Sequence, residues 1–122
     1  MKKKCPRFKS ADLLSGYLLL FLKDNPTHGY SLISKLKELG FEINEPTIIY
    51  RHLKKMENFG FIYSKIMPSD EGPPKKVFFI TDLGKVYLKE ISENIKNRVK
   101  VLNIFLEKYE RSAEDENSNS VN

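Results

Sequence analysis

The sequence of 122 residues contains one cysteine, two histidines and no tryptophan. With Cys5 alone, no disulfide can form within the chain, and we expect a reducing compartment, the cytoplasm. His28 and His52 have no second histidine or cysteine at metal-ligand spacing, so neither a metal nor another cofactor is expected. A glycine-rich phosphate loop and a nucleophile–base arrangement are also missing from the sequence. These absences argue against an enzyme.

Long hydrophobic stretches are missing too. The longest apolar run is "YLLLFL", residues 17–22, whereas a membrane span needs about 20 apolar residues. Asp12 interrupts the only stretch that resembles a signal-peptide core. We therefore expect a soluble protein with no membrane partner.

Positive charge exceeds negative charge, with a net charge of +5 and a pI near 9.2. Lysines and arginine crowd residues 2–9, and three acids lie at residues 114–116. Without those three acids the rest of the chain carries +8, since +5 minus −3 is +8. This balance favours an anionic partner, and nucleic acid in particular. Cys5 lies among these cations, where it is either a reactive thiol or an incidental one.

Three helices are expected in the first half of the chain, at residues 10–24, 27–39 and 46–59. Ser10 and Thr27 are candidate N-caps, Pro46 is a favoured first-turn residue, and Gly60 ends the third helix. The first helix is apolar around most of its circumference, so it must be covered on two sides. A second copy of the chain could supply one of those covers.

A β-hairpin is predicted from "FIYSKIM" at residues 61–67 and "KKVFFI" at residues 75–80, with turn residues between them. Thr81 is expected to cap a fourth helix that ends near Arg111. Apolar residues on that helix follow a heptad pattern that Arg98 interrupts, which indicates pairing with another helix. The pattern comprises Leu88, Ile91, Ile95, Leu102, Phe105 and Tyr109.

These elements divide the chain into four parts. We expect a basic N-terminal arm at residues 1–9 and a DNA-binding domain at residues 10–81. A dimerisation helix follows at residues 82–111, and the acidic tail at residues 112–122 is expected to be disordered.

The third helix is expected to have two different faces. Ile49, Leu53 and Met56 recur at helical spacing and would face the core. The opposite face carries a polar stripe made of Thr47, Tyr50, Arg51 and Lys54, with His52 beside it. Three helices followed by a hairpin, with basic residues on both, describe a mainly α winged helix-turn-helix with a small β-hairpin.

The third helix would fit the major groove of B-DNA, where Arg51 could bind guanine through two hydrogen bonds. Thr47 and Tyr50 could bind phosphates. Four further cations would contact the DNA backbone or the minor groove. They are Lys54 and Lys55 on the helix, and Lys75 and Lys76 after the hairpin tip. Double-stranded DNA is therefore the expected partner.

Three blocks in order, "HGYSLISKL", "TIIYRHLKKMENFGFI" and "EGPPKKVFFITDLGKVYL", resemble the PadR family of transcriptional regulators. They span residues 28–88. The resemblance implies a DNA contact for Tyr30 as well. Pro73 stands where the family usually has an arginine at the wing tip, so a minor-groove contact there is not expected.

Members of that family are dimers formed by the first and last helices, and most are repressors. The resemblance therefore implies a homodimer on an inverted repeat, with an interface formed by Leu14, Tyr17, Leu18, Phe21, Leu88, Ile91, Ile95, Leu102 and Phe105. Some members release DNA when a small aromatic effector binds. Tyr17, Phe21 and Phe105 could contact such an effector or simply belong to the core. Because the chain has no tryptophan, an effector cannot stack on an indole ring.

A second interpretation stays open at this point. A winged helix can serve as a protein–protein interaction module that uses its hairpin and its long apolar helix. Such a module has no need to keep the polar stripe free of acids, and Glu57 is the only acid close to that stripe.

Overall fold

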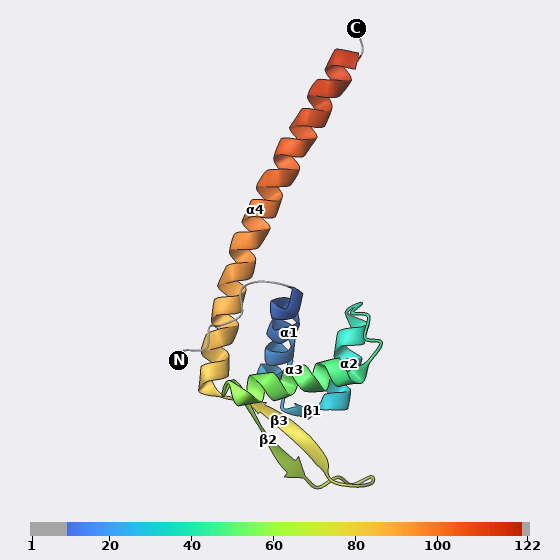
Figure 1. Cartoon of the computed structure of the whole chain (residues 1–122), viewed down its shortest axis with the longest axis vertical. Helices are drawn as coiled ribbons and strands as arrows, with labels where there is room; N and C mark the ends of the chain where they lie inside the picture. Colours follow the sequence, from blue (N-terminus) through green and yellow to red (C-terminus); the bar gives the residue numbers. More distant parts are fainter. Residues whose placement is uncertain (1–9, 121–122) are drawn as a thin grey trace. The chain divides into compact units, whose positions relative to one another are not determined.

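The structure is a computed structural model that describes residues 10–120. Its elements run in the order helix, short strand, helix, helix, two strands and a long helix (Figure 1). They are α1 (Ser10–Asp24), β1 (Thr27–His28), α2 (Gly29–Glu38), α3 (Pro46–Asn58), β2 (Ile62–Met67), β3 (Lys75–Ile80) and α4 (Asp82–Ser120). The predicted fold class, a mainly α winged helix-turn-helix with a long last helix, is confirmed. The predicted basic arm at residues 1–9, including Cys5, lies outside the described residues.

The chain forms two compact units, of which the first ends at Ile91 and the second begins at Ser92. The core of the first unit comes from apolar residues at helical spacing on α1, α2 and α3, joined by strand residues. Burying one such leucine stabilises the fold by about 2 kcal/mol. The most deeply buried members are Leu18, Leu19, Leu22, Leu32, Leu36, Ile49, Leu53 and Ile62.

The sheet has three antiparallel strands in the order β1-β3-β2. The hairpin of β2 and β3 is the predicted one, with Ile62 opposite Ile80 and Met67 opposite Lys75. The additional strand β1 pairs Thr27 with Phe78 and His28 with Val77. Thr27 is therefore a strand residue and does not cap α2 as predicted. The cap is His28, whose Nδ1 accepts a hydrogen bond from the Ser31 N–H at 3.3 Å.

The wing and α4 are connected through Thr81, which caps α4 as predicted. Its hydroxyl oxygen Oγ1 accepts a hydrogen bond from the Gly84 N–H at 2.9 Å and donates one to the Gly60 carbonyl at 2.6 Å. Gly60 has a φ of +84°, which glycine adopts at little cost after the end of α3. The turn after α3 and the start of α4 are thus held together.

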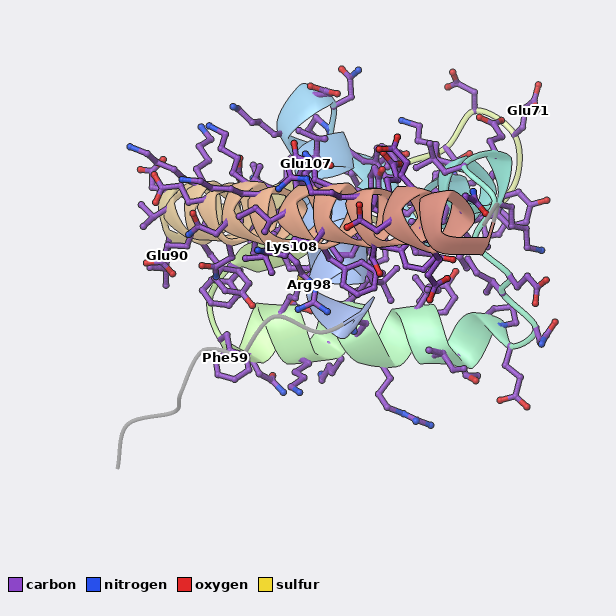
Figure 2. All side chains as sticks on the ribbon, turned by 90° about the horizontal axis from the view of Figure 1, so that it is seen from above. Phe59, Glu71, Glu90, Arg98, Glu107 and Lys108 are labelled. Carbon is purple, nitrogen blue, oxygen red and sulfur yellow. The ribbon has the colours of Figure 1, made fainter. Side chains whose placement is uncertain are left out.

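Helix α4 continues to Ser120 and does not end near Arg111. Residues 85–120 contain neither glycine nor proline, and Ala113, Glu114 and Glu116 favour helix. Extending an existing helix costs little compared with nucleating one, so the polar composition of this segment does not end it. Charged side chains, including Glu90, Glu107 and Lys108, project from this helix (Figure 2). Within residues 10–120, none of the helices combines the length and hydrophobicity that a membrane span requires.

Candidate nucleic-acid interface

Helix α3 has the two faces that its sequence predicts. Ile49, Leu53 and Met56 are buried, with at most 3% of their surface exposed. On the other side, all members of the polar stripe are exposed, and Tyr50 retains 45% of its surface. Lys55 is exposed as well. The apolar face fixes α3 to the core and leaves the polar stripe accessible.

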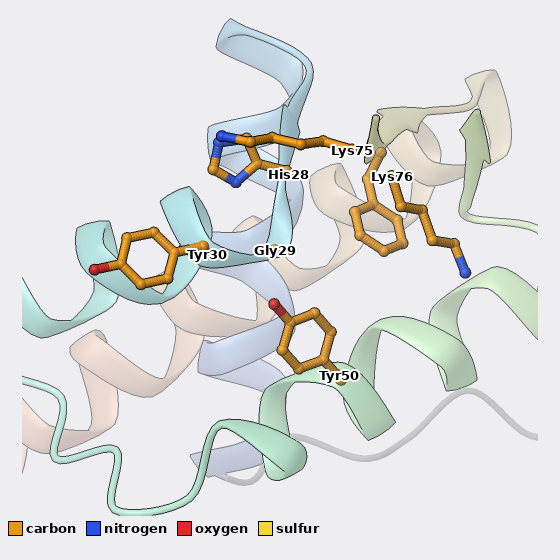
Figure 3. A pocket seen from close by; sticks show the side chains of 7 residues that line it. His28, Gly29, Tyr30, Tyr50, Lys75 and Lys76 are labelled. Carbon is orange, nitrogen blue, oxygen red and sulfur yellow. The ribbon is translucent and has the colours of Figure 1, made fainter. Parts of the chain in front are cut away.

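Three separate segments meet beside this stripe in an open pocket of about 350 Å³ (Figure 3). Tyr50 belongs to both the stripe and the pocket, so the two form one continuous surface. The lining residues are His28, Gly29, Tyr30, Tyr50, Lys75, Lys76 and Phe78. Of these, the sequence singled out Tyr30, Tyr50, Lys75 and Lys76 as candidate DNA contacts, and the structure brings all four together.

Gly29 makes this meeting possible. A Cβ atom at position 29 would lie 2.4 Å from Cε1 of Tyr50 and 2.9 Å from its hydroxyl oxygen. Because glycine has no Cβ, the Tyr50 ring lies directly against the first turn of α2, as Figure 3 shows. No pattern in the sequence indicates this contact, since it joins residues 21 positions apart (50 minus 29) in different helices.

Glu57 connects α3 to the wing. One of its carboxylate oxygens accepts a hydrogen bond from the Ser64 hydroxyl at 2.9 Å, and the other lies 4.0 Å from Nζ of Lys76. The Lys76 side chain remains 50% exposed, so this ion pair contributes little to stability. Lys76 can therefore exchange Glu57 for another anion at low cost. Lys75 is also exposed.

His52 does not lie beside the polar stripe as predicted but on the α1 side of α3. Its Nε2 forms a hydrogen bond with the hydroxyl of Ser15, which is only 4% exposed. Burial, and secondly the charge of Lys55, lower the pKa of His52 below its ordinary value of 6.5. The ring is therefore neutral at physiological pH.

The predicted dimer residues fall into three groups. Leu102 and Phe105, in the second unit, are 52% and 64% exposed, and the side chains of Leu14, Tyr17, Phe21, Leu88 and Ile95 are partly exposed. Leu18 and Ile91 are buried within the first unit, at 0% and 3% exposure. Ile91 packs against α1, where a Cβ at Gly16 would lie 3.1 Å from its Cγ2. These two residues have no surface to offer a second copy, so that part of the predicted interface is corrected.

Two of the three aromatic residues that the sequence suggests for an effector, Tyr17 and Phe21, contact each other. The Tyr17 ring lies 5.9 Å from Phe21 and meets Phe41 edge-on at 5.6 Å.

Among the described residues, no group of three or more histidine, cysteine or acidic side chains is arranged to hold a metal ion.

Comparisons with known proteins show the family to which the chain belongs. Residues 18–90 match the transcriptional regulator PadR-like family. A PadR-like transcriptional regulator from Bacillus cereus is 29% identical, with a TM-score of 0.70 over 77% of this chain and 91% of that one. A PadR-like transcription factor from Bacteroides fragilis is 26% identical, with a TM-score of 0.66 over 79% of this chain and 92% of the other. An uncharacterized protein of Lysinibacillus sphaericus is 27% identical over 80% of this chain and 94% of its own length.

The family match covers more than half of the chain, and it includes α2, α3 and the wing. The matched residues also contain the pocket and the polar stripe. The chain belongs to the PadR-like family, whose members are DNA-binding transcriptional regulators and not enzymes.

Proposed function

We propose that the protein is a repressor that binds an inverted-repeat operator as a homodimer. The observation that carries this proposal is the pocket beside α3, because it joins two tyrosines and two lysines from three segments to the polar stripe. Cations and hydroxyl groups on one exposed surface are suited to a phosphate backbone. Within α3, Glu57 is the only acid, and it points to the wing.

Each residue has a proposed role in DNA binding. Arg51 reads a guanine in the major groove, while Thr47 and Tyr50 bind phosphates at its edge. The remaining residues hold the backbone on either side: Lys54 and Lys55 from α3, Tyr30 from α2, and Lys75 and Lys76 from the wing.

The second unit supports the homodimer part of the proposal. Its helix exposes Val99, Val101, Leu102, Ile104, Phe105, Leu106 and Tyr109. Leu102, Phe105 and Tyr109 are spaced by three and four residues, as in a helix that pairs with another helix. A second copy of the same helix would cover them. Two copies would place two α3 helices about 34 Å apart, at successive major grooves of one DNA face.

The proposed effector would bind beside α1. A small aromatic compound would contact Tyr17 and Phe21, which are partly exposed and already pack against another ring. Its binding would change the packing of α1 and so release the operator.

The separate roles of Arg51 and Lys76 provide the test of this function. Arg51→Ala should lower the preference for operator over unrelated DNA by about tenfold or more, because a bidentate arginine–guanine contact is worth about 1–3 kcal/mol. Lys76→Ala should weaken both DNAs equally and reduce the slope of log affinity against log salt by about 1. Fluorescence anisotropy at several salt concentrations measures both effects. An Arg51→Ala protein that keeps the parent's preference would show that α3 does not read the sequence.

Gly29→Ala tests the pocket itself. The added Cβ should displace the half-exposed Tyr50 ring, and we expect operator affinity to fall about tenfold through the lost charged hydrogen bond. The melting temperature should change little, since the ring can move into solvent. Ser34→Ala, also on α2, is the control. Unchanged operator affinity in Gly29→Ala would remove Tyr50 from the proposed interface.

A further inference from the structure

The hydrogen bond between Ser15 and His52 joins α1 to the back of the recognition helix α3. His52 lies one residue after Arg51, yet its ring is turned to α1 and not to the exposed surface. Ser15 is buried, with only 4% of its surface exposed. The contact withdraws the Ser15 hydroxyl and part of the His52 ring from water, which costs free energy unless the bond is formed.

The same stretch of α1 also contacts α4. Gly16, next to Ser15, faces Cγ2 of Ile91, and an added Cβ at position 16 would lie only 3.1 Å from that atom. Gly16 and Ile91 are both buried. Two consecutive residues of α1 therefore contact α3 and the first part of α4, all within the first unit.

Apolar packing holds α3 against the core, and directional hydrogen bonds from α3, to Ser64 through Glu57 and to Ser15 through His52, further define its rotation. Ile49, Leu53 and Met56 attach the helix to the core through contacts that have no preferred direction. A hydrogen bond is directional, so a bond from the middle of the helix limits its rotation about its own axis. A recognition side chain must be held to within roughly 0.5 Å and 10–20° of its productive geometry. Arg51 is immediately beside the residue that supplies this constraint.

We propose that the His52–Ser15 hydrogen bond orients α3 for operator recognition, which makes His52 a positioning residue for the DNA-reading stripe. This inference rests on the proposed function. The polar stripe contacts DNA, and α1 sets the angle at which it does so. Gly16 of α1 contacts Ile91 at the start of α4. A displacement of that part of α4 would therefore move α1, and through the Ser15–His52 bond it would move α3.

The neutral state of His52 agrees with this role. Burial lowers the pKa of the ring, and the charge of Lys55 acts in the same direction. A neutral imidazole can accept a hydrogen bond from the Ser15 hydroxyl or donate one to its oxygen, so the bond forms without a buried charge.

The test uses the full chain with Ser15→Ala, His52→Ala, His52→Gln and the Ser15→Ala/His52→Ala double variant. Ser15→Ala and His52→Ala should each lower operator affinity about tenfold and change affinity for unrelated DNA less than twofold. The double variant should be no weaker than the weaker single variant, because both remove the same bond. His52→Gln should restore most of the affinity, since the glutamine Nε2 can occupy the place of the imidazole Nε2. Ser34→Ala is the matched control on α2.

Anisotropy is measured at a temperature where circular dichroism shows each variant to be folded. If His52→Ala does not fold, Ser15→Ala and His52→Gln still decide the matter. Variants that melt earlier but keep the parent's ratio of operator to unrelated affinity would overturn the positioning role. A parent protein without any operator preference would instead refute the proposed function, so the two failures are distinguishable.

Discussion

Replacing Leu102 and Phe105 together by glutamate is expected to convert the proposed homodimer into a monomer and to lower affinity for the proposed operator at least a hundredfold. Both side chains are more than half exposed in the single chain, at 52% and 64%, so charge there should not disturb its folding. In a helix pair the same positions would bury unpaired carboxylates, at a cost of several kcal/mol. A monomer would then bind one half-site where the dimer binds two. Sedimentation velocity gives the oligomeric state, and anisotropy gives the affinity.

The matched control is Asn97→Glu with Asn103→Glu. It adds the same charge to the same helix, but both positions lie outside the 3-4 spacing of Leu102, Phe105 and Tyr109. The control should remain dimeric and bind the operator as the parent does. A Leu102→Glu/Phe105→Glu protein that stays dimeric would show that another surface pairs the subunits.

Gly84→Ala is expected to give the largest loss of stability, about 3 kcal/mol, through overpacking at the start of α4. A Cβ at position 84 would lie 2.1 Å from the carbonyl oxygen of Phe61 and 2.8 Å from Cγ1 of Ile80. The Phe61 oxygen already accepts a hydrogen bond from the Thr81 N–H at 3.0 Å, so the backbone cannot move away without losing that bond. The melting temperature should fall by on the order of 10 °C.

Lys85→Ala is the control for that substitution, because Lys85 is the next residue and is exposed. Its free energy of unfolding should change by less than about 0.5 kcal/mol. Thermal unfolding followed by circular dichroism measures both variants. If Gly84→Ala melts within 2–3 °C of the parent, the close contact between α4 and the turn after α3 is not needed for stability.

The elements that the sequence predicts correctly are those with local determinants. Pro46 and Gly60 mark the ends of α3, and the β-branched and aromatic runs of the hairpin are separated by turn residues. Thr81 begins α4 through its own side chain. In each case neighbouring residues decide the structure, so a pattern in the sequence is sufficient.

The differences arise where distant contacts decide. Strand β1 has only two residues and exists because β3 pairs with it. Ile91 fits the predicted heptad pattern and Leu18 belongs to the apolar surface of the first helix, but packing within the first unit covers both. His52 carries no sequence pattern that indicates Ser15 as its partner, which is 37 residues away.

Four of the pocket residues were predictable from the sequence as candidate DNA contacts, but their arrangement was not. The resemblance to the family indicated Tyr30, and charge indicated Lys75 and Lys76. Their meeting with Tyr50 depends on Gly29, a contact that only the folded chain reveals. Phe78 lines the same pocket and was expected only as a strand residue.

The central claim, sequence-specific DNA binding, is tested most directly by anisotropy with labelled DNA from the region upstream of the protein's own gene. A shuffled duplex serves as the control, and both are measured at low and near-physiological salt. We expect tight binding to the upstream DNA that persists at the higher salt, and weak binding to the shuffled duplex that does not. Equal affinity for both duplexes, lost together as salt rises, would contradict the claim for this DNA. Failure to bind either duplex would favour a protein–protein interaction module.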